Sequence, residues 1–172
     1  MKNITYIFLL NIFMFTVGCG TLYNLTEDAH DRRERRAGLD PLHIHSCGPT
    51  AMEKAHELYG GSVDRVLISK ELQDKGNFLR SFLSVFSHHA RSITFPGEII
   101  EYFESRNFTI NKIKDFKDLK KNDVALILVK KKYSISYHWM CYPVDLNIFT
   151  FYGRGSTVIT DIYLIKPPPK TT

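Results

Sequence analysis

The sequence predicts an α+β domain in which helices come first and strands follow. Apolar residues recur at helical spacing as far as residue 106, and short apolar or alternating runs follow from residue 108. A hydrophobic content of 44% over 172 residues is enough for one domain with its own core. Helices and strands that are segregated in this way favour an antiparallel sheet with the helices packed against one side.

The amino-terminal segment is expected to be a targeting signal rather than part of the hydrophobic core. Lys2 precedes a mostly apolar run at residues 4–17, which is shorter than the roughly 20 residues that a membrane-spanning helix needs. This pattern is typical of a secretory signal. We therefore divide the chain into a signal at residues 1–19, a charged tether at 20–42, a folded domain at 43–166 and a proline-rich tail at 167–172.

The end of this segment, Thr-Val-Gly-Cys-Gly at residues 16–20, resembles a bacterial lipobox. The resemblance implies that Cys19 is acylated and anchors the domain on the extracytoplasmic face of the cell membrane or outer membrane. Thr16 departs from the Leu, Val or Ile that is usual at its position. Plain secretion, an uncleaved anchor and a buried structural helix are the alternatives.

The first half of the folded part reads as helical. Pro49 suits an early helical position, because its missing N–H has no partner to lose there, and Gly60-Gly61 provides a stop. The ranges with helical spacing are Cys47–Tyr59, Val63–Leu72 and Phe78–His88 (one or two helices between them), and Glu98–Arg106 after a turn at residues 94–97.

The second half reads as strands. The continuous apolar run Val124–Val129 suits a strand that is buried on both faces. Further strands are predicted at Phe108–Ile110, His138–Val144, Ile148–Tyr152 and Val158–Leu164, with a short helical turn at Phe116–Lys121 and a tight turn at Asp145–Asn147.

One cysteine is placed where a thiol becomes reactive. Cys47 opens the first predicted helix, and the partial positive charge at a helix amino terminus stabilises a thiolate. A thiolate nucleophile needs an imidazole that forms the ion pair and later donates a proton. His138 begins a later strand, and the start of that strand can face the amino terminus of the helix. We therefore predict a Cys47–His138 dyad. The alternatives are a buried inert thiol and a core histidine.

The remaining composition points away from other classes of site. The three cysteines, Cys19, Cys47 and Cys141, show no paired Cys/His ligand spacing, so neither a metal site nor another cofactor is expected. The net charge of +5 is spread thinly, with clusters at Arg32–Arg36 and Lys130–Lys132. We interpret these clusters as solvated surface, which disfavours nucleic acid as a partner. The alternative is a basic surface that attracts anionic lipid or nucleic acid.

The segment "CGPTAM", its helix and the later strand "HWMCYPV" resemble the C39-like cysteine peptidases of the papain-like superfamily. The resemblance spans residues 46–152 and implies a papain-like α+β fold, a Cys47 nucleophile and a His138 general base. The family's orienting Asp or Asn is replaced here by Tyr152, with Asn147 and Asp145 nearby in a turn. No Gln precedes Cys47 to act as the oxyanion donor, so His43 or His45 is the candidate for that role, beside the Cys47 backbone N–H.

These observations predict a membrane-tethered, extracytoplasmic cysteine hydrolase, a peptidase or amidase, that acts on a peptide or protein substrate. The alternative is an inactive C39-like pseudoenzyme that binds a partner protein at the cell surface, which the missing acid and Gln would favour.

Overall fold

A computed structural model describes residues 41–44, 46–86, 88–132, 137–145 and 157–169. The helical half contains α3 (Pro41–Ile44), α4 (Cys47–Leu58), α5 (Arg65–Asp74), α6 (Phe78–Phe86), the 3₁₀ helix η2 (His88–Ser92) and α7 (Pro96–Glu104). The second half contains β1 (Thr109–Ile113), the 3₁₀ helix η3 (Phe116–Asp118), β2 (Val124–Lys131), β3 (Tyr137–Tyr142) and β4 (Thr157–Lys166). None of the described helices is long and apolar enough to cross a membrane.

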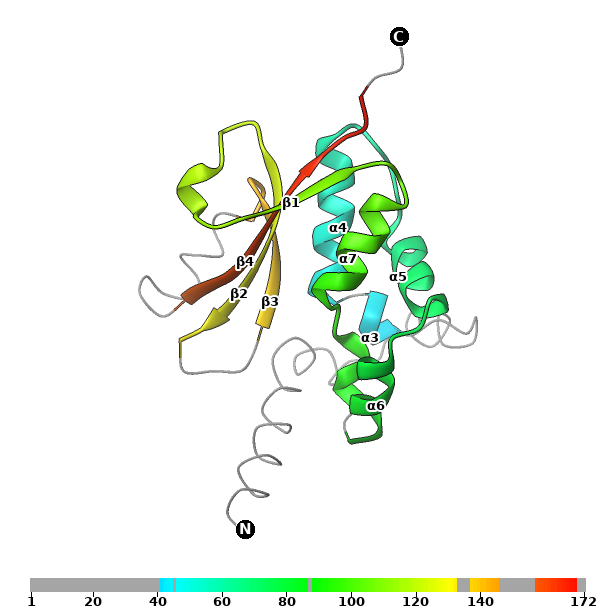
Figure 1. The fold of residues 1–172 in the computed structure, drawn as a ribbon. Helices are drawn as coiled ribbons and strands as arrows, with labels where there is room; N and C mark the ends of the chain where they lie inside the picture. Colours follow the sequence, from blue (N-terminus) through cyan, green and yellow to red (C-terminus); the bar gives the residue numbers. More distant parts are fainter. Residues whose placement is uncertain (1–40, 45, 87, 133–136, 146–156, 170–172) are drawn as a thin grey trace.

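The predicted α+β class is confirmed. The four strands form one antiparallel sheet in the order β1-β4-β2-β3, and α4 and α7 lie along one side of it (Figure 1). The predicted strand Ile148–Tyr152 lies outside the described residues. The first described element, α3, packs against α5 and η2.

The apolar composition of strand β2 follows from its position in the sheet. Its alternate residues Val124, Leu126 and Leu128 belong to the main core between sheet and helices. The residues between them, Ala125, Ile127 and Val129, belong to a second cluster on the other face of the sheet, where Phe116 and Leu119 cover them. Both faces are therefore buried, and a continuous apolar run is the pattern that such a strand requires.

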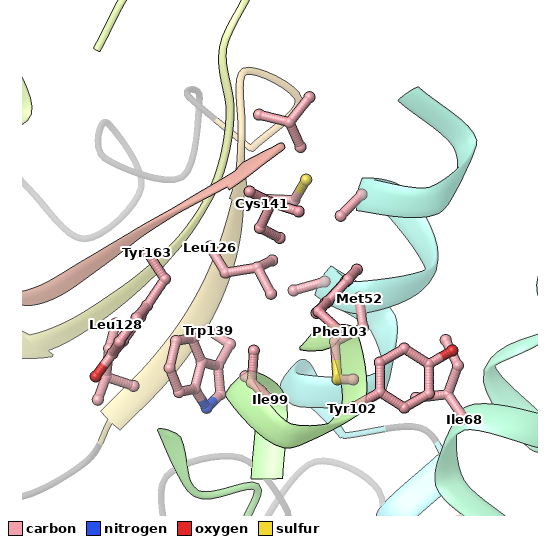
Figure 2. Packing of buried hydrophobic residues seen from close by; sticks show 14 of the residues in the cluster. Met52, Ile68, Ile99, Tyr102, Phe103, Leu126, Leu128, Trp139, Cys141 and Tyr163 are labelled. Carbon is pink, nitrogen blue, oxygen red and sulfur yellow. The ribbon is translucent and has the colours of Figure 1, made fainter. Parts of the chain in front are cut away.

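The main core fixes α4 against the sheet. Met52 and Ala55 of α4 are buried together with Ile99 and Phe103 of α7. Figure 2 shows Met52, Ile99 and Phe103 on the side of the sheet that carries Leu126, Trp139 and Cys141. Trp139 and Cys141 of β3 alternate into this core, so the helix that begins with Cys47 and the strand that carries His138 share one packed interface. Close packing of this kind holds the two elements in a fixed relation.

Candidate active site

Cys47 is the first residue of α4, as predicted. Ser46 precedes it in an extended conformation, and its hydroxyl donates to the His43 carbonyl (2.7 Å) instead of capping the helix. Pro49 contributes no N–H, and the Thr50 amide already donates to the Ser46 carbonyl. The sulfur is therefore placed at the amino end of a 12-residue helix dipole whose first turn has no side-chain cap from Ser46.

His138 is the second residue of β3, the strand at one edge of the sheet. In the register of the sheet it lies opposite Val129 of β2. Its neighbour Trp139 is anchored, because the indole Nε1 donates to the Thr94 carbonyl at 2.9 Å. Packing of α4 against β3 brings this end of the strand to the start of the helix.

The structure brings Cys47 and His138 together: their side chains are joined by a hydrogen bond. Burial of the ring lowers the pKa of His138, whereas the hydrogen bond to Cys47 and the negative charges of Cys47 and Asp145 raise it. The positive charge of Lys54 acts in the lowering direction, and the pKa of His138 is nevertheless raised from its ordinary value. This environment favours an imidazolium beside a thiolate, the ion pair that a cysteine nucleophile uses.

Asp145 is a described carboxylate whose negative charge acts on His138. Its side chain is almost fully buried and accepts hydrogen bonds from the Cys141 amide (2.8 Å) and from Lys54 Nζ (2.6 Å). Lys54 belongs to α4, two turns after Cys47, and Cys141 belongs to β3. Asp145 thus ties the two elements of the dyad to each other, and its charge acts on His138.

The loop between η2 and α7 contacts the residues next to both members of the dyad. Thr94 in this loop accepts the Trp139 hydrogen bond and lies directly against Gly48, the residue after Cys47. A Cβ at position 48 would overlap the Thr94 side chain, so only glycine allows the start of α4 to approach so closely.

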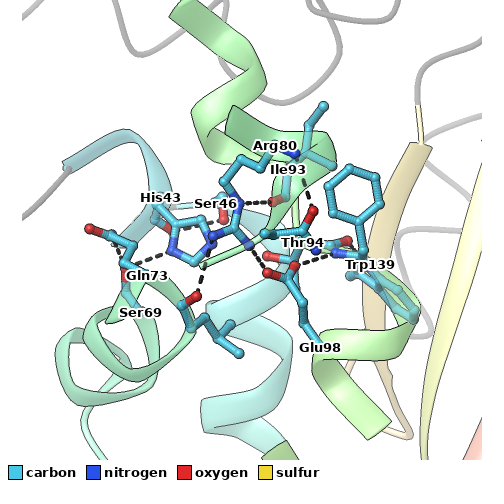
Figure 3. A network of polar contacts seen from close by, with 12 residues as sticks. His43, Ser46, Ser69, Gln73, Arg80, Ile93, Thr94, Glu98 and Trp139 are labelled. Carbon is cyan, nitrogen blue, oxygen red and sulfur yellow. Dashed lines mark hydrogen bonds and ion pairs between the residues drawn. The ribbon is translucent and has the colours of Figure 1, made fainter. Parts of the chain in front are cut away.

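A buried ion pair supports this loop (Figure 3). The Arg80 guanidinium of α6 pairs with Glu98 of α7 and donates to the carbonyls of Ile93 (2.9 Å) and Leu72 (3.4 Å). Glu98 also accepts from the Phe95 amide at 2.8 Å, which caps α7. The charges of the pair are satisfied, as burial of ionic groups requires.

The role predicted for His43 is wrong. Its ring is completely buried, and Nδ1 bonds the Ser69 hydroxyl of α5 at 2.7 Å. Burial and the nearby positive charge of Arg80 lower the pKa of His43 to about 3, so the ring is neutral. A ring without exposed surface cannot donate to a substrate oxygen, and this histidine instead packs α3 against α5.

The other predicted site residues, Cys19, His45, Asn147 and Tyr152, lie outside the described residues. Within the described part of the chain, no group of three or more His, Cys, Asp or Glu side chains is arranged to hold a metal ion. Cys141, the other thiol of the described domain, is fully buried, and its pKa is raised to about 12, first of all by burial.

Sequence reasoning missed two parts of the site. It left open whether Asp145 lies close enough to act on His138, and it did not identify Lys54 as the ion-pair partner of this carboxylate. It also passed over Arg80, although a single charged residue inside the mostly apolar segment Phe78–Phe86 is a signal for a buried, paired cation. Comparison of the chain with protein-family models, with curated proteins and with solved structures finds no match.

Proposed function

We propose that this protein is a membrane-tethered, extracytoplasmic thiol hydrolase that cleaves a peptide or amide bond, built on a C39-like, papain-like domain. The observation that carries the proposal is the hydrogen bond between Cys47, at the amino terminus of α4, and His138 of β3. The raised pKa of His138 supports it, because an imidazolium that persists beside the sulfur favours the reactive thiolate.

The first half of the reaction uses the ion pair. The Cys47 thiolate attacks the carbonyl carbon of the scissile bond, and the carbonyl π electrons move to oxygen. Backbone N–H groups at the first turn of α4 and the helix dipole stabilise the resulting oxyanion. The tetrahedral intermediate collapses with cleavage of the C–N bond, and His138 gives its proton to the leaving amine. A thioester on Cys47 and neutral His138 remain.

The second half regenerates the protein. Neutral His138 takes a proton from water, whose oxygen attacks the thioester carbonyl carbon. Collapse of this second intermediate breaks the C–S bond and releases a carboxylic acid, which ionises. The Cys47 thiolate and the His138 imidazolium are restored, so atoms, charges and protons balance over the cycle.

Asp145 acts in this scheme as a positioning residue. Its carboxylate is held by Lys54 and by the Cys141 amide, and its negative charge stabilises the His138 imidazolium through space. In this chain it takes over part of the electrostatic role that an orienting acid has in other cysteine hydrolases. The positive charge of Lys54 opposes this effect on the pKa of His138.

The experiment is covalent labelling of the full chain with iodoacetamide at neutral pH, followed by peptide mass spectrometry. Cys47 is expected to label faster than an unactivated cysteine, and Cys47→Ala to abolish this fast phase. Cys141→Ala is the matched control and keeps the fast phase, because the Cys141 thiol is buried. Hydrolysis is then tested with denatured casein, by detection of new peptides that Cys47→Ala does not produce. Labelling of Cys47 at the rate of a free cysteine contradicts the proposal.

A catalytically silent binding module of the same fold is the second candidate. Two observations favour it: the Asp145 carboxylate is already occupied by Lys54 and the Cys141 amide, and no Gln precedes Cys47 in the sequence. A fast-labelling Cys47 without any cleavage of casein or of a peptide library supports this candidate over the hydrolase.

A further inference from the structure

Helix α6 presents an apolar face to solvent. Phe78, Leu79, Phe82 and Val85 are 82%, 53%, 50% and 79% exposed, and their spacing puts them on one side of the helix. The Phe78 and Phe82 rings stack, with centroids 6.2 Å apart. We call these four residues the α6 apolar face. Contiguous exposed apolar surface of this kind marks an interaction site.

The apolar face cannot turn inward, because the opposite side of α6 is fixed. Arg80 is only 7% exposed, and its guanidinium bonds Glu98 and the carbonyls of Ile93 and Leu72. A rotation of α6 that buried the phenyl rings would break these bonds and leave the Arg80 charge unpaired, which is costly. The fold therefore holds the apolar face outward.

The chain that precedes the described domain indicates what this face meets. The described part of the domain begins at Pro41 of α3, which packs against η2, and η2 packs in turn against α6. Figure 1 shows α3 and α6 at the same end of the molecule. The apolar run at residues 4–17 joins the domain at this end through residues 18–40.

Basic residues accompany the same end. The four arginines of Arg32–Arg36 lie within nine residues of Pro41, so chain length alone keeps them within roughly 30 Å of α3. Arg91 of η2 is exposed beside α6. Exposed aromatic and aliphatic side chains with an exposed arginine on the neighbouring η2 suit an anionic lipid surface, since the apolar groups enter the interface and the cation meets the headgroups.

We propose that the α6 apolar face docks on an anionic lipid bilayer, with the Phe78 and Phe82 rings at the level of the headgroups and upper acyl chains. This contact is separate from the apolar run at residues 4–17 and orients the domain on the membrane. It does not depend on whether Cys47 is catalytic.

The test uses tryptophan fluorescence in the full chain. The native chain has one tryptophan, Trp139, which is buried in the core and gives a constant background. Phe82→Trp adds a reporter on the apolar face, and Phe78→Trp is a second reporter if the first variant folds poorly. Val158→Trp is the matched control, since Val158 is an exposed apolar residue on β4. Each variant is mixed with vesicles of phosphatidylglycerol and phosphatidylcholine whose acyl chains are brominated.

The expected result is loss of the added emission for Phe82→Trp and no loss for Val158→Trp, although residues 4–17 are present in both. Vesicles of phosphatidylcholine alone are expected to quench Phe82→Trp less. Equal quenching of the two variants, or quenching of neither, overturns the proposal. A change of Phe82→Trp emission with protein concentration, insensitive to bromine, would instead mean that a second copy of the chain covers the face, and would also overturn it.

Discussion

Replacement of Gly48 by alanine tests the packing that holds the dyad together. All three nearest atoms to a Cβ at position 48 belong to the Thr94 side chain, and even the farthest, Cγ2, would be only 2.8 Å away. The nearest, Oγ1, would be 2.2 Å away, whereas an ordinary contact begins at 3.4 Å, so the Thr94 side chain or the start of α4 must retreat by more than 1 Å. The Thr94 carbonyl also accepts the Trp139 hydrogen bond, and this movement therefore reaches the residue next to His138.

The magnitude follows from the general cost of overpacking. Gly48→Ala is expected to lower the free energy of unfolding by about 1–3 kcal/mol. Gly97 provides a matched control, because it is also the second residue of a helix, in α7, and a Cβ there would meet nothing within 4 Å. Gly97→Ala is expected to raise the free energy of unfolding by about 0.4–1 kcal/mol through the reduced entropy of the unfolded chain. The two variants should thus differ in sign.

The assay is urea unfolding at equilibrium, followed by the alkylation rate of Cys47. A shift of the two dyad elements by a fraction of an ångström up to 1 Å is expected to slow the alkylation of Cys47 in Gly48→Ala by up to about 100-fold, and Gly97→Ala should leave it unchanged. Equal stability and equal alkylation rates in Gly48→Ala and the unmodified chain would refute the close contact with Thr94.

Three further predictions concern charged groups. Arg80→Met leaves Glu98 buried without its partner and should lower the free energy of unfolding by about 3–5 kcal/mol, measured by urea unfolding. His43 has a lowered pKa, so the native state resists a proton that the unfolded state binds, and stability falls as pH drops from about 6.5 to about 3. His43→Gln should remove up to about 1.4 kcal/mol per pH unit of this loss, measured by unfolding across that window. Asp145→Asn removes a charge that raises the pKa of His138, so NMR titration of the ring should give a lower pKa in the variant, and an unchanged value would contradict the positioning role.

Local sequence signals predicted much of the fold. The helix at Cys47 was predicted to end near Gly60, and α4 ends at Leu58 with Gly60 in the left-handed region that glycine favours. The apolar run Val124–Val129 forms a strand buried on both faces, for the reason that predicted it. The insertion of β4 between β1 and β2 was not predictable, because it depends on pairing between segments far apart in the chain.

The candidate site was predictable to the extent that its chemistry is local. A cysteine at a helix start and a histidine at a strand start predicted the pair, with a buried inert thiol and a core histidine as the alternatives. The position of the Asp145 carboxylate relative to His138 depends on how the chain turns after β3 and on a lysine from α4. Neither can be seen in the sequence around Asp145. His43 was misassigned because its burial comes from the packing of α3 on α5, which no periodic pattern in a four-residue helix reveals.

The pH dependence of Cys47 alkylation, compared between the unmodified chain and His138→Gln, tests the central claim most directly. If His138 holds the thiolate, the unmodified chain reacts on the acid side of an ordinary thiol pKa of about 8.5, and His138→Gln loses this reactivity. A single transition near the ordinary cysteine value in both proteins would contradict the account, since the sulfur and the imidazole would then be neighbours without forming an ion pair.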